Sequence, residues 1–174
     1  MEEKSKPEPW LRGTLTELPA VHRAVLHALL LADENAHTFC SSLSDEEINA
    51  MPFGIASVGF HLRHIAGSVD RLLTYAEGRQ LAPVQIATLT HEAAPNAETR
   101  QVLADLRNAL QSGSDRVSAL AAANLEAVRS VGRRALPTTV GGLLVHVADH
   151  TQRHIGQAIT TAKIVQFSRQ RNSG

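Results

Sequence analysis

Three histidines lie one helical turn apart in the last third of the chain, namely His146, His150 and His154. On an α-helix with 3.6 residues per turn they form a stripe along one side. Two imidazoles on neighbouring turns can hold one divalent ion, because the turns bring both rings to a common point. His146 and His154 are about 12 Å apart along such a helix, too far to share an ion. A mononuclear site would therefore use two adjacent members of the stripe and take its other ligands from elsewhere.

A second histidine pair, His61 and His64, lies in the segment HLRHIAG beside another apolar helical stripe. In a helical bundle, ligands from facing helices converge in the interior. Three neutral histidines would leave one position of a tetrahedral ion open for water or substrate, which is typical of a catalytic site rather than a structural one. Imidazole suits zinc, nickel, copper and iron alike. Periodicity alone does not choose between His61 and His64, or between the two adjacent pairs of the stripe.

Four long amphipathic helices are expected to position these residues. Apolar residues recur at helical spacing in four segments, at about 19–41, 57–77, 97–125 and 137–165. Ser57 is a suitable N-cap for the second segment, and Gly78 is a suitable stop after it. Gly113 lies inside the third, where we expect a kink or a break. A short capped helix is predicted at Ser44-Asp45-Glu46-Glu47.

The connections complete the predicted fold. Residues 79–96 contain Pro83 and Pro95 and form a long connection, which suits a crossover over one end of a bundle. Residues 126–136 form a basic linker, and no segment is convincing as a strand. We therefore predict an all-α protein, a four-helix bundle with a long crossover connection. It would be one domain over residues 1–174, with loose tails at 1–9 and 166–174.

Composition narrows the classes of function. The chain has 174 residues, of which 43% are hydrophobic, and a formal net charge of zero, which indicates an ordinary globular protein. Without a basic block or a long apolar run, we expect neither a nucleic-acid partner nor a membrane span. Cys40 is the only cysteine, so there is no intramolecular disulfide and no cysteine metal site. A cytoplasmic location is the default expectation, and a homodimer is a candidate assembly.

Two segments carry a family resemblance. SVGFHLRHIAGSVDRL at 57–72 and TVGGLLVHVADHTQRHIGQ at 139–157 resemble the DinB/YfiT-like metalloenzymes of the DinB superfamily, and the resemblance extends from about Trp10 to Lys163. It implies a four-helix bundle with a three-histidine metal site. The first ligand would be His64, seven residues after the helix-starting serine and just before Ile65-Ala66. The other two would be His150 and His154, the histidines of an H-x-x-x-H-x-G-Q motif. Zinc and nickel are the first candidates for the single divalent transition metal ion.

Other residues near these ligands are candidates for supporting roles. Some could orient the ligands or a substrate through hydrogen bonds, namely His61, His146, Asp149 and Gln157. Gly67 and Gly156 are expected to let neighbouring helices approach closely.

The sequence thus predicts a metal-dependent enzyme acting on a small-molecule substrate. Water activated by the ion would support a hydrolase, whereas a low-molecular-weight thiol would support S-transfer or isomerisation. The resemblance includes thiol-dependent transferases. No acidic residue occupies a position that identifies it as a general base, which favours thiol transfer. The alternative is a non-enzymatic metal-binding bundle, with a stress-response or structural role and a fourth protein ligand such as His61.

Overall fold

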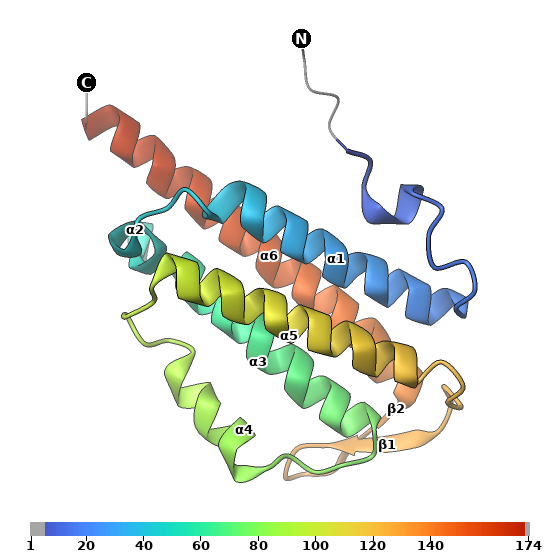
Figure 1. Ribbon diagram of the computed structural model, residues 1–174. Coiled ribbons are helices and arrows are strands. Elements are labelled where there is room, and N and C mark those ends of the chain that lie inside the picture. Colours follow the sequence, from blue (N-terminus) through green and yellow to red (C-terminus); the bar gives the residue numbers. More distant parts are fainter. Residues whose placement is uncertain (1–5, 173–174) are drawn as a thin grey trace.

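Four long helices form the body of the protein in the computed structural model, which describes residues 6–172. They are α1 (Ala20–Cys40), α3 (Val58–Ala76), α5 (Thr99–Ala119) and α6 (Val140–Asn172) (Figure 1). α6 packs against α1 and α3, and α5 packs against the same two helices. α1 and α6 run in one direction and α3 and α5 in the opposite one (Figure 1). The predicted all-α fold is confirmed, and it sets the histidines of α3 beside those of α6.

Local capping decides where α3 begins and ends. The Ser57 hydroxyl accepts a hydrogen bond from the Phe60 amide at 3.1 Å, which satisfies a free donor of the first turn. Gly78 ends the helix in the left-handed region, at a φ of 78°. The short helix α2 (Asp45–Asn49) has the predicted cap at Ser44, and a 3-10 turn (Pro52–Gly54) follows it. These local signals fix the position of His64 within α3.

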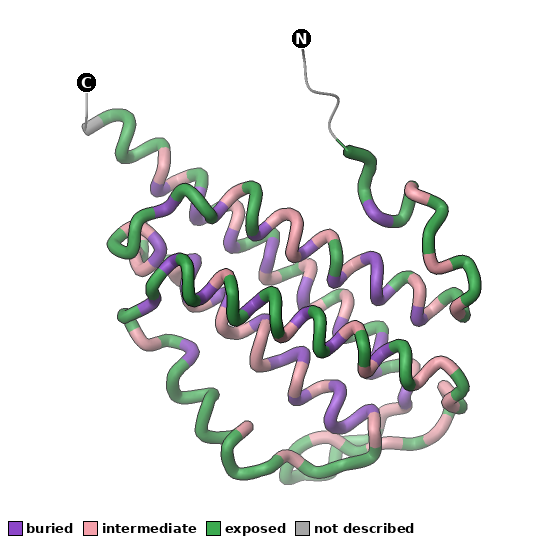
Figure 2. The backbone as a smooth tube through the Cα atoms, in the orientation of Figure 1, coloured by how far each residue is buried: buried purple, intermediate pink, exposed green. Residues whose placement is uncertain are grey.

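The core lies on the inner faces of the four long helices, where the buried residues gather in Figure 2. Its largest fully buried side chains include Leu29, Leu62, Leu106 and Ile155, one from each long helix. The predicted kink at Gly113 is wrong, since α5 runs through this position without a break. A Cβ atom there would lie 2.6 Å from Val69 Cγ1 of α3. Glycine is therefore needed for the close approach of α5 to α3.

A long crossover joins α3 to α5. Because these two helices are parallel, the chain must return along the bundle before α5 begins. The returning segment contains α4 (Pro83–Ala87) and a 3-10 helix, η3 (Thr88–His91). Most of it is exposed, as Figure 2 shows. The side chain of Arg63 on α3 holds its far end, donating to the Ala94 carbonyl at 2.7 Å.

Residues 126–136 differ from the prediction of a linker without strands. β1 (Val128–Val131) pairs antiparallel with β2 (Leu136–Thr139), with Val128 opposite Thr139. The backbone pairing forms although most of these side chains are exposed, so no apolar run marked the strands. α5 also stops earlier than expected, at Ala119 rather than near 125, and turns over 120–127 lead into the hairpin.

The predicted C-terminal tail, 166–174, differs from the prediction over its described part, 166–172, and residues 173–174 lie outside the described residues. α6 continues to Asn172, so the segment from 166 is helical rather than loose. Gln166 donates to the Phe39 carbonyl at 3.3 Å, and Arg169 pairs with Glu47 at 3.2 Å. These contacts with α1 and α2 hold the last turns, which their polar sequence did not indicate.

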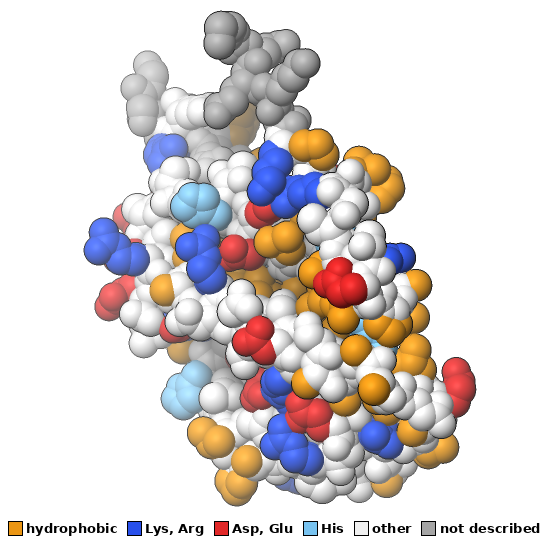
Figure 3. Space-filling view, turned by 45° about the vertical axis from the view of Figure 1, so that its right-hand side comes forward, with side chains coloured by type: hydrophobic (Ala, Val, Ile, Leu, Met, Phe, Trp, Pro, Cys, Tyr) orange, Lys and Arg blue, Asp and Glu red, His pale blue; other side chains and the backbone are white. Residues whose placement is uncertain are grey.

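The predicted N-terminal tail, 1–9, lies partly outside the described residues, which begin at Lys6. A 3-10 turn (Pro9–Leu11) precedes α1, and Arg12 forms a bidentate pair with Glu34 at 2.8 and 2.6 Å. Basic and acidic side chains are interspersed over the face shown in Figure 3, with apolar side chains between them. Within residues 6–172, no helix combines the length and the apolar character needed to span a bilayer.

Candidate metal centre

Three histidines from two helices converge between α3 and α6. One nitrogen of each ring of His64, His150 and His154 lies within 4.8 Å of the corresponding nitrogens of the other two. The Nε2 atoms of His64 and His150 are 2.9 Å apart. The ring centroids of His64 and His150 both lie near that of His154, at 4.5 Å in each case. All three side chains are partly buried.

The donor set fits a divalent transition metal ion. Two imidazole nitrogens that share a tetrahedral zinc ion at about 2.1 Å lie about 3.4 Å apart, so the Nε2 atoms of His64 and His150 need to separate by only a few tenths of an ångström. His150 and His154 are one helical turn apart on α6, and His64 faces them from α3. Among the described residues, no fourth histidine, cysteine or acidic residue joins this group. A tetrahedral ion held here would keep one position open.

Burial disfavours the charged form of two of the imidazoles, those of His150 and His154. Desolvation, followed by the proximity of His154 and His64, lowers the pKa of His150 to about 4. Desolvation also lowers the pKa of His154. A histidine must be deprotonated to bind a metal ion, so the lowered pKa values of His150 and His154 favour the form that binds.

His61 supports the cluster without joining it. Its side chain is buried, and its Nδ1 atom lies 3.1 Å from Nδ1 of His154. Burial, then the proximity of His154, lowers the pKa of His61 to about 4. With Nδ1 of His154 engaged by His61, the Nε2 atom of His154 is the one available to an ion. This contact fits the predicted role of His61 in orienting a ligand.

The other predicted supporting residues lie further out. His146 is exposed, with Nδ1 3.5 Å from Asp149 Oδ2. Asp149 pairs with Arg153 at 2.6 Å on the outer surface of α6, and Gln157 is exposed. The structure therefore places His146 beside His150, with a ring-centroid separation of 5.3 Å, but brings neither Asp149 nor Gln157 into the histidine cluster.

Sequence reasoning missed an acidic residue of this site. Glu92, in the crossover, accepts a hydrogen bond from His64 Nδ1 at 2.6 Å, and its side chain is only 8% exposed. Burial would raise the pKa of Glu92, but the contacts with His64 and Arg71 outweigh burial and lower it. The residue comes directly after η3, in a segment whose sequence has no motif. Only the path of the crossover brings it to α3.

Arg71 and Gly67 complete the surroundings of Glu92. Arg71 Nη1 lies 2.8 Å from Glu92 Oε1, forming a buried ion pair. A Cβ atom at Gly67 would lie 2.5 Å from Glu92 Oε1 and 2.6 Å from Arg71 Nη1. Gly67 therefore makes room for two side chains rather than for a neighbouring helix. At Gly156 a Cβ atom would meet nothing within 4 Å, so the predicted close approach there is wrong.

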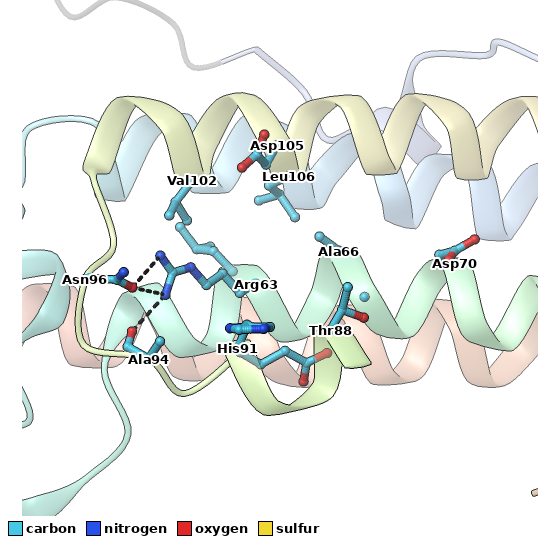
Figure 4. A pocket seen from close by; sticks show the side chains of 13 residues that line it. Arg63, Ala66, Asp70, Thr88, His91, Ala94, Asn96, Val102, Asp105 and Leu106 are labelled. Carbon is cyan, nitrogen blue, oxygen red and sulfur yellow. Dashed lines mark hydrogen bonds between the residues drawn. The ribbon is translucent and has the colours of Figure 1, made fainter. Parts of the chain in front are cut away.

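A cavity of about 460 Å³ lies between α3, α5 and the crossover (Figure 4). Apolar side chains of α3 and α5 form part of its wall, among them Leu62 and Leu106. Arg63 crosses one end and bonds to Ala94 and Asn96, as the dashed lines in Figure 4 show. Glu92 also lines this cavity, so the same carboxylate lies in the wall of the cavity and contacts His64 of the histidine cluster.

Comparison with known proteins agrees with this geometry. The sequence matches the DinB superfamily over residues 28–158, a range that includes all three clustered histidines. No curated protein and no solved structure gave a significant match. With most of its length matched, and with the helical bundle that the resemblance implied, the chain belongs to the DinB superfamily.

Proposed function

We propose that this protein is a metal-dependent enzyme with one divalent transition metal ion on His64, His150 and His154, zinc or nickel being the first candidates. The observation that carries the proposal is the convergence of three imidazoles from two helices without a fourth ligand among the described residues. A bound ion would lower the pKa of a water or thiol at its open position and so provide a nucleophile at neutral pH. The protein would act as a hydrolase or as a thiol-dependent S-transferase or isomerase.

The chain's own residues favour the thiol reaction. Glu92 is the nearest acidic residue to the cluster, yet both of its oxygens are engaged, one by His64 and one by Arg71. A carboxylate held in this way is poorly placed to accept a proton from water. A thiol ionised at the ion needs no further base, so a low-molecular-weight thiol is the favoured partner of a small electrophilic substrate. The cavity beside Glu92 is large enough for such a substrate.

Elemental analysis of the purified protein beside its His64→Ala and His154→Ala variants tests the metal site. Each variant should hold much less metal than the parent while keeping the helical circular dichroism spectrum of the parent. The loaded parent should then be assayed with electrophiles in the presence of cellular thiols, and separately with esters and amides. A loaded protein that reacts with none of these, or whose ion has four protein ligands, would instead be a metal-binding bundle without enzymatic activity.

A further inference from the structure

The burial of Glu92 sets it apart from most residues of the crossover. The crossover is mostly exposed, yet it turns this one carboxylate inward and buries it against α3. Three residues of α3 at spacings of four form the surface that receives it: Arg63, Gly67 and Arg71. Arg63 holds the backbone at Ala94, Gly67 leaves the space, and Arg71 pairs with the carboxylate.

The contact between Glu92 and His64 determines where the imidazole proton lies. An ionised carboxylate can only accept hydrogen bonds, so at 2.6 Å the Nδ1 atom of His64 must be the donor. In a neutral imidazole the other nitrogen, Nε2, then carries the lone pair. That Nε2 atom is the one that faces His150. The tautomer required of a metal ligand is therefore already set at His64.

The two other clustered histidines have no such partner. His154 is contacted at Nδ1 by His61, another imidazole, and an imidazole pair permits either ring to donate. Among the described residues, no acidic side chain other than Glu92 makes a hydrogen bond to a ring of the cluster. His64 is thus the one member of the three whose orientation and tautomer are both fixed by a charged group.

We propose that Glu92, held by Arg71 in the space left by Gly67, is the positioning residue of this site and presents Nε2 of His64 to the ion. This inference rests on the proposed metal site. Carboxylates that receive the second N–H of a metal-bound histidine typically contribute about 10- to 100-fold to metal affinity. A crossover residue that belongs to no recognisable motif would then set the metal affinity of the site. Because Glu92 also lines the cavity, one side chain would connect the cavity with the metal site.

The first measurement needs no metal. Long-range ¹H–¹⁵N spectra of the imidazoles report which nitrogen of each histidine is protonated. In the metal-free parent, His64 should be protonated at Nδ1. In Glu92→Ala it should become a mixture of tautomers, and in Glu92→Gln it should shift less, because the amide oxygen can still accept. An unchanged His64 signature in both variants would overturn the proposal.

The second measurement is metal affinity, from competition of Zn²⁺ or Co²⁺ against a chelator of known affinity. Glu92→Ala should bind about 10- to 100-fold more weakly than the parent, with a smaller loss in Glu92→Gln. Co²⁺ spectra of the variant should differ from those of the parent. Asp105→Asn is the matched control: this carboxylate lines the same cavity but bonds to Gln101 on the surface of α5. It should leave both affinity and spectrum unchanged.

Gly67→Ala gives a test that alters no group bonded to His64. The added methyl would collide with Glu92 and Arg71 and displace them, so metal affinity and His64 tautomer should change in the same direction as in Glu92→Ala. If Glu92 only anchors the crossover, its variants should lower the melting temperature and leave tautomer and affinity at parental values, which would overturn the proposal. If the parent binds no metal, the proposed function fails, while the metal-free spectra still decide the role of Glu92.

Discussion

α3 takes part in two polar clusters that are built in opposite ways. On the side facing α5, Arg116 donates to Glu77 through Nε at 2.6 Å and to Asp70 through Nη1 at 2.7 Å. Thr74 and Gln85 bond to the same groups: Arg116 donates to Thr74 at 3.1 Å, and Gln85 donates to Asp70 at 2.7 Å. Opposite charges alternate here, and donors meet acceptors. The Arg116 cluster is therefore complete in itself.

On the side facing α6, groups of one kind meet each other. The Nε2 atoms of His64 and His150 are 2.9 Å apart, and the Nδ1 atoms of His61 and His154 are 3.1 Å apart. Each such pair can be bridged by only one proton, and burial disfavours adding a second. The Arg116 cluster therefore contributes to the stability of the bundle, whereas the group of His64, His150 and His154 could hold a metal ion that accepts several lone pairs at once.

The largest effect should come from removing a histidine of the cluster. His150→Ala should weaken metal binding by more than the roughly 100-fold upper value for an outer contact, because a direct ligand is lost. The metal-free variant should be about as stable as the parent. Chelator competition and urea unfolding measure the two quantities. His146→Ala, one turn earlier and exposed, is the matched control and should bind metal as the parent does. An equal loss of metal affinity in His150→Ala and His146→Ala would contradict the assignment of His150, and not His146, to the metal site.

Breaking the Arg116 cluster should lower the stability of the protein and leave its metal affinity unchanged. Arg116→Met leaves Glu77 with Arg79 and Asp70 with Gln85 as their remaining donors. The free energy of unfolding should fall by about 2 kcal/mol, a value already reduced because the ion pair is partly exposed. Metal affinity should not change. Urea unfolding of the metal-free protein checks the cost, with Arg107→Met, which breaks a more exposed pair with Asp33, as the milder control. A variant as stable as the parent would contradict the structural role of this cluster.

Lowering the pH should have a smaller effect, which also distinguishes the histidine cluster from the Arg116 cluster. Burial and the proximity of His154 lower the pKa of His61 and that of His150 to about 4. From the ordinary histidine pKa near 6.5 down to about 4, the unfolded chain therefore binds more protons than the folded one. The metal-free protein should lose stability as the pH falls through this window, and His61→Gln should make the loss less steep. The measurement is urea unfolding of the parent and of His61→Gln at several pH values. If the free energies of unfolding of the two proteins change with pH in parallel, His61 makes no such contribution.

Glu77 should affect the stability of the protein only at lower pH in the same experiment. Burial would raise the pKa of Glu77, but Arg116 and Arg79 outweigh burial and lower it below its ordinary value of 4.5. Its stabilising contribution is complete above that value and is lost as the pH falls through the folded-state pKa. Glu77→Gln should therefore leave the slope above pH 4.5 unchanged. A change of slope near neutral pH would show that the two clusters are not separate.

The smallest effect is expected on the outer surface of α6. Asp149→Ala removes an exposed pair with Arg153, which should cost about 0.3–0.5 kcal/mol, the usual value for such pairs on a helix. Metal affinity should stay at the parental value, because Asp149 lies outside the histidine cluster. Thermal unfolding and chelator competition provide the measurements. A large fall in affinity would assign Asp149 the ligand-orienting role that the sequence suggested for it.

Local signals predicted most of the fold. Ser57 and Gly78 bound α3 as expected, because capping depends on residues a few positions away. The hairpin at 128–139 was missed, since its side chains are largely exposed and leave no alternating pattern strong enough to read. Gly113 was misread because the propensity penalty of a glycine in a helix says nothing of the neighbour that requires it, here Val69.

For the site, the three histidines could be chosen from the sequence, because helical spacing sets His146, His150 and His154 on one face and the family motifs then select His64, His150 and His154. Their surroundings depend on the packing of the folded chain. His61 meets His154 across two helices, and Glu92 reaches His64 from a crossover 28 residues further along the chain. Contacts between distant segments depend on how helices pack and where connections run, and no local pattern encodes them. The candidate ligands can therefore be identified from periodicity together with the family motifs, whereas the groups that contact them are brought into place only when the chain folds.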